Sequence, residues 1–173
     1  PVRSPGVSAA TSEDGRLPLE ATLRAARDAG RKLLVPYVTG GMDDTWLTTL
    51  RAMADAGADA VEVGIPFSDP VMDGPTIQAA AQQALEGGVR TRDVLRTVEV
   101  VAATGVPTLV MTYWNPVESY GRVSGRSHQG SGVEQFAADL ASAGGAGLIT
   151  PDLTPDSGEE WIAAADAHDL DKV

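Results

Sequence analysis

Short β-rich runs alternate with longer alanine-rich runs along most of this chain, and this alternation constrains the fold more than any other feature. The short runs predict strands at residues 32–39, 60–65, 107–114 and 146–150, with a further short strand at 171–173. The longer runs repeat apolar residues at helical spacing and predict helices at residues 19–28, 45–56, 77–85, 92–103, 133–143 and 159–167. Strands separated by helices indicate a parallel sheet with right-handed crossovers.

A parallel sheet of this kind is either open and doubly wound or closed into a barrel. Gly40-Gly41 and the other turns lack the GxGxxG pattern of dinucleotide-binding sheets. Acidic residues instead lie in and just after the second predicted strand, where barrel enzymes carry catalytic groups. We therefore predict an α/β fold of the (β/α)8 TIM-barrel type. A complete barrel needs about 250 residues, so the predicted strands correspond to about its first half.

Small residues and prolines mark the boundaries of the predicted elements. Gly57 and Gly144 are expected to end helices, and Asp43 or Asp44 to cap the helix that starts near residue 45. Residues 1–17 are expected to be a flexible leader, and residues 18–173 to belong to a single barrel domain. A Ser/Gly-rich segment at 122–132 reads as a surface loop inserted into that domain.

Composition excludes several classes of function. The formal net charge of −11 argues against nucleic-acid binding, because no basic patch offsets phosphate repulsion. The chain has no cysteine, which excludes disulfides, thiolate zinc sites and a cysteine nucleophile. His128 and His168 lack a neighbouring set of metal ligands. With no apolar run of roughly 18 residues and no signal pattern, we expect no membrane association and a cytoplasmic location.

The second predicted strand carries a carboxylate at its centre. Alternation along the strand puts Val61, Val63 and Ile65 on one face, and Glu62 with Gly64 on the other. The β-branched face is expected to pack against helices, which turns Glu62 toward the barrel interior. An acid in such surroundings has a raised pKa and suits proton transfer near neutral pH. A structural ion pair or a hydrated position at the barrel mouth is the other interpretation of Glu62.

Two aspartates, Asp69 and Asp73, follow on a loop that contains several prolines. A loop stiffened by proline at the mouth of a barrel is able to hold a carboxylate in a fixed place. Aspartate is also a common turn residue, and either side chain could serve only to bond a nearby backbone amide.

Four segments together resemble the tryptophan synthase alpha subunit family. They are Pro36-Tyr-Val-Thr-Gly-Gly41, Glu62-Val-Gly-Ile-Pro-Phe-Ser-Asp-Pro70 with Met72-Asp-Gly-Pro-Thr-Ile-Gln78, Met111-Thr-Tyr-Trp-Asn-Pro116, and Gly147-Leu-Ile-Thr-Pro-Asp-Leu153. The resemblance runs from about Leu33 to the carboxyl end and is interrupted by the segment at 122–132. It implies a lyase that cleaves indole-3-glycerol phosphate to indole and glyceraldehyde 3-phosphate in tryptophan biosynthesis.

The resemblance also implies roles for individual residues. Glu62 matches the general acid/base, and Asp73 matches the carboxylate that bonds the indole N–H. The positions that match the indole pocket are Tyr37, Ile77, Met111, Tyr113 and Ile149, although aromatic and aliphatic residues on barrel strands often serve only the packing. Asp69 and Pro70 match the loop that touches a beta subunit in a heterotetramer of two alpha and two beta chains. No cofactor is implied here, since pyridoxal phosphate belongs to the beta subunit.

Two features depart from the family pattern. The segment at 122–132 replaces an almost direct passage into the next helix, and Arg122 and Arg126 within it leave open a docking role. The family's phosphate-binding turn and mobile lid follow later barrel strands than those predicted here. A non-catalytic module that only binds or activates a beta-type subunit is therefore an alternative. A phosphate-binding isomerase barrel of the histidine or tryptophan pathway is a weaker one, because Glu62 and Asp73 do not fit it.

Overall fold

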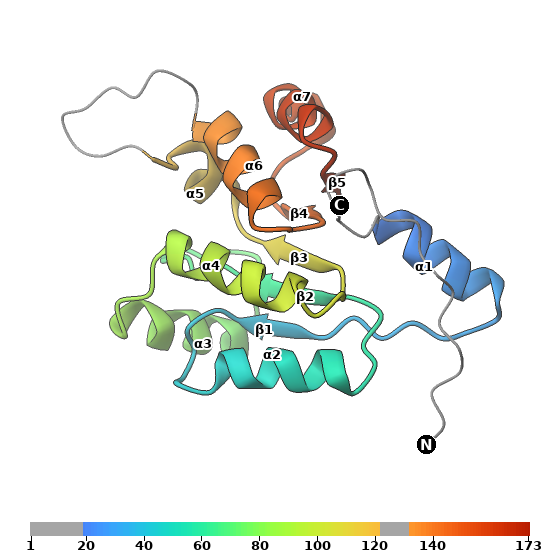
Figure 1. Ribbon diagram of the computed structural model, residues 1–173. Helices are drawn as coiled ribbons and strands as arrows, with labels where there is room; N and C mark the ends of the chain where they lie inside the picture. Colours follow the sequence, from blue (N-terminus) through green and yellow to red (C-terminus); the bar gives the residue numbers. More distant parts are fainter. Residues whose placement is uncertain (1–18, 122–131) are drawn as a thin grey trace.

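The computed structural model describes residues 19–121 and 132–173, and Figure 1 shows how their helices and strands are arranged. The predicted leader at 1–17 lies outside these residues, and so does the predicted insertion at 122–132 apart from Gly132. Within the described part of the chain, no helix is long and apolar enough to span a bilayer.

A single parallel sheet forms the centre of the fold. Its five strands are ordered β1-β2-β3-β4-β5. They are β1 (Tyr37–Thr39), β2 (Val61–Gly64), β3 (Thr108–Met111), β4 (Gly147–Ile149) and β5 (Asp171–Lys172). Each strand pairs with its neighbour in sequence, whereas a doubly wound sheet reverses its strand order partway. The predicted barrel-type topology is therefore confirmed.

Helices precede or connect the strands, and an outer layer of them covers the convex face of the sheet. They are α1 (Leu19–Asp28), α2 (Trp46–Asp55), α3 (Pro75–Glu86), α4 (Thr91–Ala102), α5 (Trp114–Glu118), α6 (Gly132–Ser142) and α7 (Glu159–Ala167), with a 3₁₀ turn at Pro155–Ser157. Helices α2, α4, α6 and α7 contact one another in succession and form the outer layer, as Figure 1 shows. Gly57 and Gly144 have positive φ and follow helices, as predicted.

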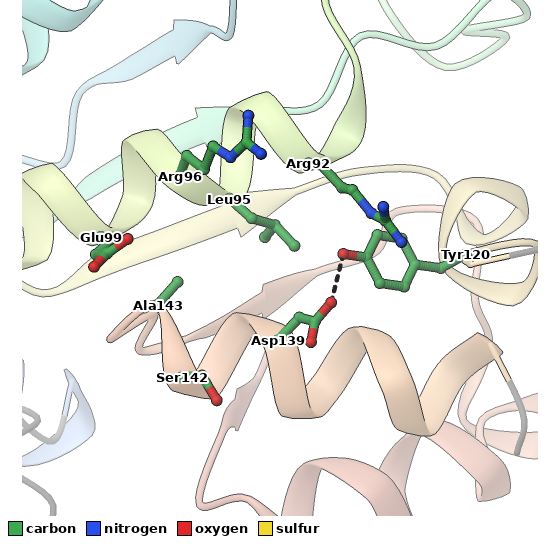
Figure 2. A pocket seen from close by; sticks show the side chains of 8 residues that line it. All are labelled: Arg92, Leu95, Arg96, Glu99, Tyr120, Asp139, Ser142 and Ala143. Atoms are coloured by element: carbon green, nitrogen blue, oxygen red, sulfur yellow. Dashed lines mark hydrogen bonds between the residues drawn. The ribbon is translucent and has the colours of Figure 1, made fainter.

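A polar contact joins the residues that follow α5 to α6 on the outer layer, beside a surface pocket of about 280 Å³ (Figure 2). The Tyr120 hydroxyl donates to a carboxylate oxygen of Asp139 at 2.7 Å. Gln135, one turn earlier on α6, donates to the other oxygen at 2.7 Å. Burial and the bond to Asp139 raise the pKa of Tyr120 to about 12, and the nearby Arg92 opposes this shift. The contact therefore favours the protonated phenol.

Replacing Tyr120 with phenylalanine is expected to change how stability depends on pH above 10. The unfolded phenol has a pKa of 10.0 and the folded one a pKa of about 12, so across this window only the unfolded chain loses the proton. Wild-type stability therefore falls as pH rises, by about 2–3 kcal/mol from this group. Guanidinium unfolding of the wild type and of Tyr120→Phe between the two pKa values measures how the free energy of unfolding of each depends on pH. The contributions of the other tyrosines cancel in the difference between the two proteins. Parallel curves for the two proteins would contradict the assignment.

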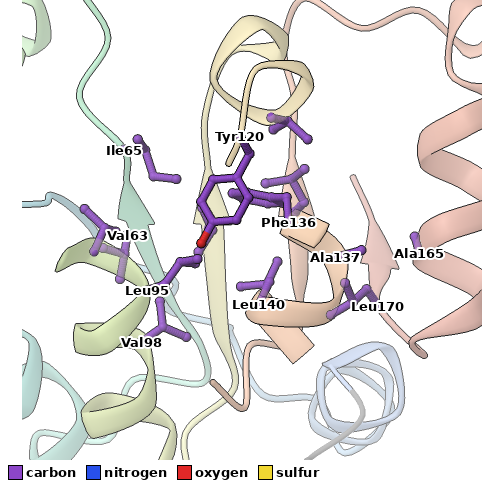
Figure 3. Packing of buried hydrophobic residues seen from close by; sticks show 14 of the residues in the cluster. Val63, Ile65, Leu95, Val98, Tyr120, Phe136, Ala137, Leu140, Ala165 and Leu170 are labelled. Carbon is purple, nitrogen blue, oxygen red and sulfur yellow. The ribbon is translucent and has the colours of Figure 1, made fainter. Parts of the chain in front are cut away.

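The main hydrophobic core lies between the convex face of the sheet and the outer helices (Figure 3). Val61 and Val63 on β2 are fully buried, and Ile65 follows them on the same face. Facing them are residues of the helices, including Val94 and Val98 on α4. The alternation predicted for this strand is confirmed, because its β-branched residues all enter this core.

A second, smaller cluster lies on the concave face. Leu19 and Leu23 of α1 pack there against Ala60, Leu109 and Ala146. Figure 1 shows α1 beside the amino-terminal ends of the strands. The small alanine side chains leave room for the leucines, so α1 covers the floor of the concave face and leaves its carboxyl end open.

The predicted first strand began too early. It starts at Tyr37, not at residue 32, for two reasons. The Leu34 amide donates to the Asp59 carboxylate at 2.9 Å, and Pro36 has no N–H to donate. The helix after β1 also differs from the prediction. Its N-cap position is Thr45, and Asp43 instead accepts hydrogen bonds from the Thr45 amide and hydroxyl in the preceding turn.

The predicted third strand was too long. It ends at Met111, and Trp114 begins the short helix α5 that the sequence had not indicated. Both carboxylate oxygens of Asp152, on the loop after β4, accept from the Trp114 amide at 2.9 and 3.1 Å. A carboxylate satisfies the free N–H groups of a helix start, so this contact between distant parts of the chain turns the strand into a helix.

Candidate active site

The strand register places several of the predicted site residues on the concave face. Tyr37 pairs with Glu62, and Gly64 pairs with Met111, which in turn pairs with Ile149. Neighbouring residues of a parallel sheet point to the same side, and residues two apart along a strand share that side. These five positions therefore form two adjoining rows at the carboxyl ends of the strands.

Glu62 lies in the first of these rows and is half-buried. Burial raises the pKa of its carboxyl group above the ordinary range, because removal from water disfavours the charged form. Its neighbours along the short strand β2, Val61 and Val63, are fully buried in the main core. Because side chains alternate along a strand, the Glu62 side chain points to the opposite face. A glutamate with these properties exchanges protons at a pH closer to neutrality than a hydrated one does.

The side chain of Tyr37 extends over Gly64. A Cβ atom on Gly64 would lie 2.1 Å from the Tyr37 hydroxyl, so any other residue at position 64 would displace the ring from its place. The Thr39 hydroxyl donates to this phenol at 3.2 Å. Burial raises the pKa of Tyr37 despite that bond, and the negative charges of Asp73 and Glu62 raise it further. The phenol thus lies within electrostatic reach of both carboxylates.

The loop between β2 and α3 is anchored to the residues that follow β3. The rings of Phe67 and Tyr113 pack with their centroids 5.3 Å apart. Tyr113 is only 3% exposed, and its hydroxyl accepts a hydrogen bond from the Met72 amide at 2.9 Å. Burial raises the pKa of Tyr113, and the neighbouring Asp73 carboxylate adds to the shift. Asp73 is therefore held at the mouth of the concave face.

The two predicted acids lie on the same side of the sheet, and both are within electrostatic reach of the Tyr37 phenol. Asp73 influences the phenols of both Tyr37 and Tyr113, and Glu62 influences Tyr37. A strand and the loop that follows it carry the two carboxylates to one end of the fold. Such a pair, in which burial raises the pKa of Glu62, suits proton transfer and the stabilisation of a developing positive charge.

The remaining predicted site residues divide into two groups. Ile77, on the first turn of α3, is half-buried, as are Met111 and Ile149 on the concave face. Asp69 instead faces solvent, and its carboxylate accepts a hydrogen bond from the Ser68 hydroxyl at 2.6 Å. Asp69 thus lies on the outer part of the loop, whereas the half-buried Pro70 begins the turn that carries Asp73.

Two residues near the site were not singled out in the sequence. Asp152 connects the loop after β4 to the start of α5, and Gln78 of α3 donates to backbone carbonyls of the loop that carries Asp73. Both lie within the recognised motifs, but their partners are distant or depend on the loop conformation. In the described residues, no group of three or more histidine, aspartate or glutamate side chains is arranged to hold a metal ion.

Parallel strands that pair in sequence order, with helices between them, define the class of protein as an α/β protein of the TIM-barrel type. The family model described as "Tryptophan synthase alpha chain" matches residues 23–173. The chain belongs to the tryptophan synthase alpha chain family. The resemblance stated from the sequence motifs is thereby confirmed.

Individual relatives agree with this assignment. A tryptophan synthase alpha chain from Salinispora arenicola is 54% identical over 150 residues, covering 86% of this chain and 52% of that protein. One from Nocardia farcinica is 50% identical over 154 residues, covering 88% and 54%. A crystal structure of tryptophan synthase from M. tuberculosis matches with a TM-score of 0.80 and 43% identity, covering 94% of this chain and 60% of that chain. The chain spans about half the length of these curated relatives.

Proposed function

We propose that this chain carries the acid–base half of the active site of an indole-releasing lyase. The full-length protein that contains it would act as the alpha subunit of tryptophan synthase in the cytoplasm and cleave indole-3-glycerol phosphate to indole and glyceraldehyde 3-phosphate. The observation that carries this proposal is that Asp73 and a half-buried Glu62, whose pKa burial raises, both lie near the Tyr37 phenol at the carboxyl end of the sheet. Family membership supports it independently.

The proposed reaction is a retro-aldol cleavage. Glu62 donates a proton to carbon 3 of the indole ring and accepts the proton of the hydroxyl group on the adjoining glycerol carbon. The bond between ring and chain breaks, its electron pair returns to the ring, and the hydroxyl carbon becomes the aldehyde. Asp73 accepts the hydrogen bond of the ring N–H and stabilises the positive charge of the protonated ring. Glu62 gives one proton and receives one, so it ends the cycle unchanged.

The concave face supplies apolar surroundings suited to the indole ring. Met111 and Ile149 adjoin in one row, and Tyr37 extends over Gly64 beside them. Ile77 approaches from α3, which contacts β1. We propose that these side chains and Tyr113 bind the ring. Burial of the indole ring among these aliphatic and aromatic side chains would contribute binding free energy, and the two acids would orient the ring.

We further propose that the loop after β2 binds a beta subunit in a heterotetramer. Next to Asp69 and Pro70, the side chains of Val71 and Met72 are 83% and 61% exposed. Apolar side chains that project together from a loop are characteristic of protein-binding surfaces. The alpha chain itself would need no cofactor, and pyridoxal phosphate would belong to the partner.

Release of indole from indole-3-glycerol phosphate tests the proposal directly. The full-length subunit is expected to form indole and glyceraldehyde 3-phosphate in equal amounts, both alone and with a beta subunit. The 173-residue chain is assayed in parallel, to show whether it retains any of this activity. If the full-length subunit bound a beta subunit but released no indole, the protein would be a non-catalytic module instead.

A further inference from the structure

The Asp73 carboxylate is carried by a four-residue turn with little packing of its own. The turn is closed by a hydrogen bond from the Asp73 amide to the Pro70 carbonyl at 3.1 Å. Its two central residues, Val71 and Met72, are largely exposed to solvent. Apolar burial therefore contributes little to the conformation of this turn, and polar contacts from outside it must fix the position of Asp73.

The side-chain amide of Gln78 supplies contacts at both ends of the turn. Its Nε2 atom donates to the Asp73 carbonyl at 2.8 Å and to the Pro70 carbonyl at 3.4 Å. Gln78 belongs to the first part of α3, whose backbone begins directly after Gly74. The helix therefore holds the turn that precedes it through a single side chain that folds back over its own amino-terminal end.

A second contact comes from the opposite side. The buried Tyr113 hydroxyl accepts a hydrogen bond from the Met72 amide at 2.9 Å, so the middle of the turn is bound to the residues that follow β3. Together, Gln78 and Tyr113 engage two carbonyls and one amide of a single turn. The backbone that carries Asp73 is thus held from α3 on one side and from the end of β3 on the other.

We propose that Gln78 is a positioning residue for Asp73 in the lyase reaction. The inference rests on the function proposed above and adds a residue that does not touch the substrate. A neutral amide suits this role, since it donates to the backbone carbonyls and adds no charge beside the Asp73 carboxylate, which would bind the ring N–H. A lysine in its place would bring a positive charge to the turn, which would compete with the ring for that carboxylate.

The expected size of the effect follows from the sensitivity of catalysis to geometry. A displacement of about 1 Å in a catalytic group lowers the rate by about 100-fold. Gln78→Ala in the full-length subunit is therefore expected to lower kcat for indole release by about 10- to 100-fold, while KM changes by less than about threefold. Gln78→Glu keeps the shape but loses the donor, so it is expected to behave like Gln78→Ala.

Gln82→Ala provides a matched control. Gln82 lies one turn later on α3 and donates to the Glu86 carboxylate at 2.8 Å, away from the turn. It is expected to retain the wild-type kcat and to have the same melting temperature as Gln78→Ala. If Gln78→Ala kept the wild-type kcat, or if Gln82→Ala lost as much activity, the positioning role would be wrong.

A double-mutant cycle separates this inference from the proposed function. In an Asp73→Asn background, Gln78→Ala is expected to lower kcat by less than about twofold, because the group that it positions is already disabled. A full additive loss would mean that Gln78 acts through general stability and would overturn the inference. If Asp73→Asn alone left kcat unchanged, the role of Asp73 in the proposed function would be wrong instead.

Discussion

Replacing Glu62 with glutamine in the full-length subunit is expected to lower kcat for indole release by about 10²- to 10⁴-fold, the contribution of a general acid or base. Glutamine keeps the size of the side chain on β2 but transfers no proton, and the proposed reaction needs Glu62 both as donor and as acceptor. KM is expected to change little, because the apolar surroundings of the ring are preserved. Steady-state indole release with saturating indole-3-glycerol phosphate measures the effect.

The same variant is expected to be at least as stable as the wild type at neutral pH. Burial raises the pKa of Glu62, so the folded protein holds this proton more tightly than the unfolded chain does. As pH rises past the pKa of the unfolded glutamate, the unfolded chain releases the proton first, and wild-type stability falls. Glutamine carries no titratable proton, so the variant does not lose stability in this way as pH rises. A variant that is both active and less stable at neutral pH would contradict the proton-transfer role and the burial argument together.

Replacing Asp73 with asparagine is expected to lower kcat by about 10²- to 10³-fold, the usual effect of removing one group that stabilises charge in a transition state. Asparagine is still able to accept a hydrogen bond from the ring N–H, so binding is expected to be largely retained. The negative charge that stabilises the protonated ring is lost, and the loss therefore appears in kcat. Single-turnover measurements of indole formation separate this chemical step from product release.

Asp55→Asn is the control for Asp73→Asn. Asp55 is an exposed residue at the end of α2, so this variant removes the same charge from the acidic protein without touching the loop. It is expected to release indole at the wild-type rate. An equal loss in both variants would point to the net charge of the protein, and a normal rate in Asp73→Asn would remove this residue from the chemistry.

Features set by local sequence were predictable. The alternation around Glu62 follows from the two-residue period of a strand, and the valines on either side of it are fully buried as expected. Helices α1 and α7 have the predicted bounds. The presence of an acid on the concave face was therefore readable from a few adjoining residues.

Features that depend on contacts between distant segments were not predictable in this way. Helix α5 begins where it does because Asp152 binds the Trp114 amide from another loop. The first strand starts later than predicted because the Leu34 amide donates a hydrogen bond to the Asp59 carboxylate. Tyr113 looked like a pocket residue, and nothing in its sequence context indicated its bond to the Met72 amide. These contacts join residues whose separation along the chain carries no local signal.

The ring of Tyr37 above Gly64 makes these two positions interdependent. Because the ring carbons as well as the hydroxyl crowd the missing Cβ, phenylalanine in place of Tyr37 would not relieve the clash with alanine in place of Gly64. A larger residue at position 64 therefore requires either that the Tyr37 ring move or that a smaller residue replace it. In both cases a change at position 64 would also reshape the part of the concave face that Tyr37 covers.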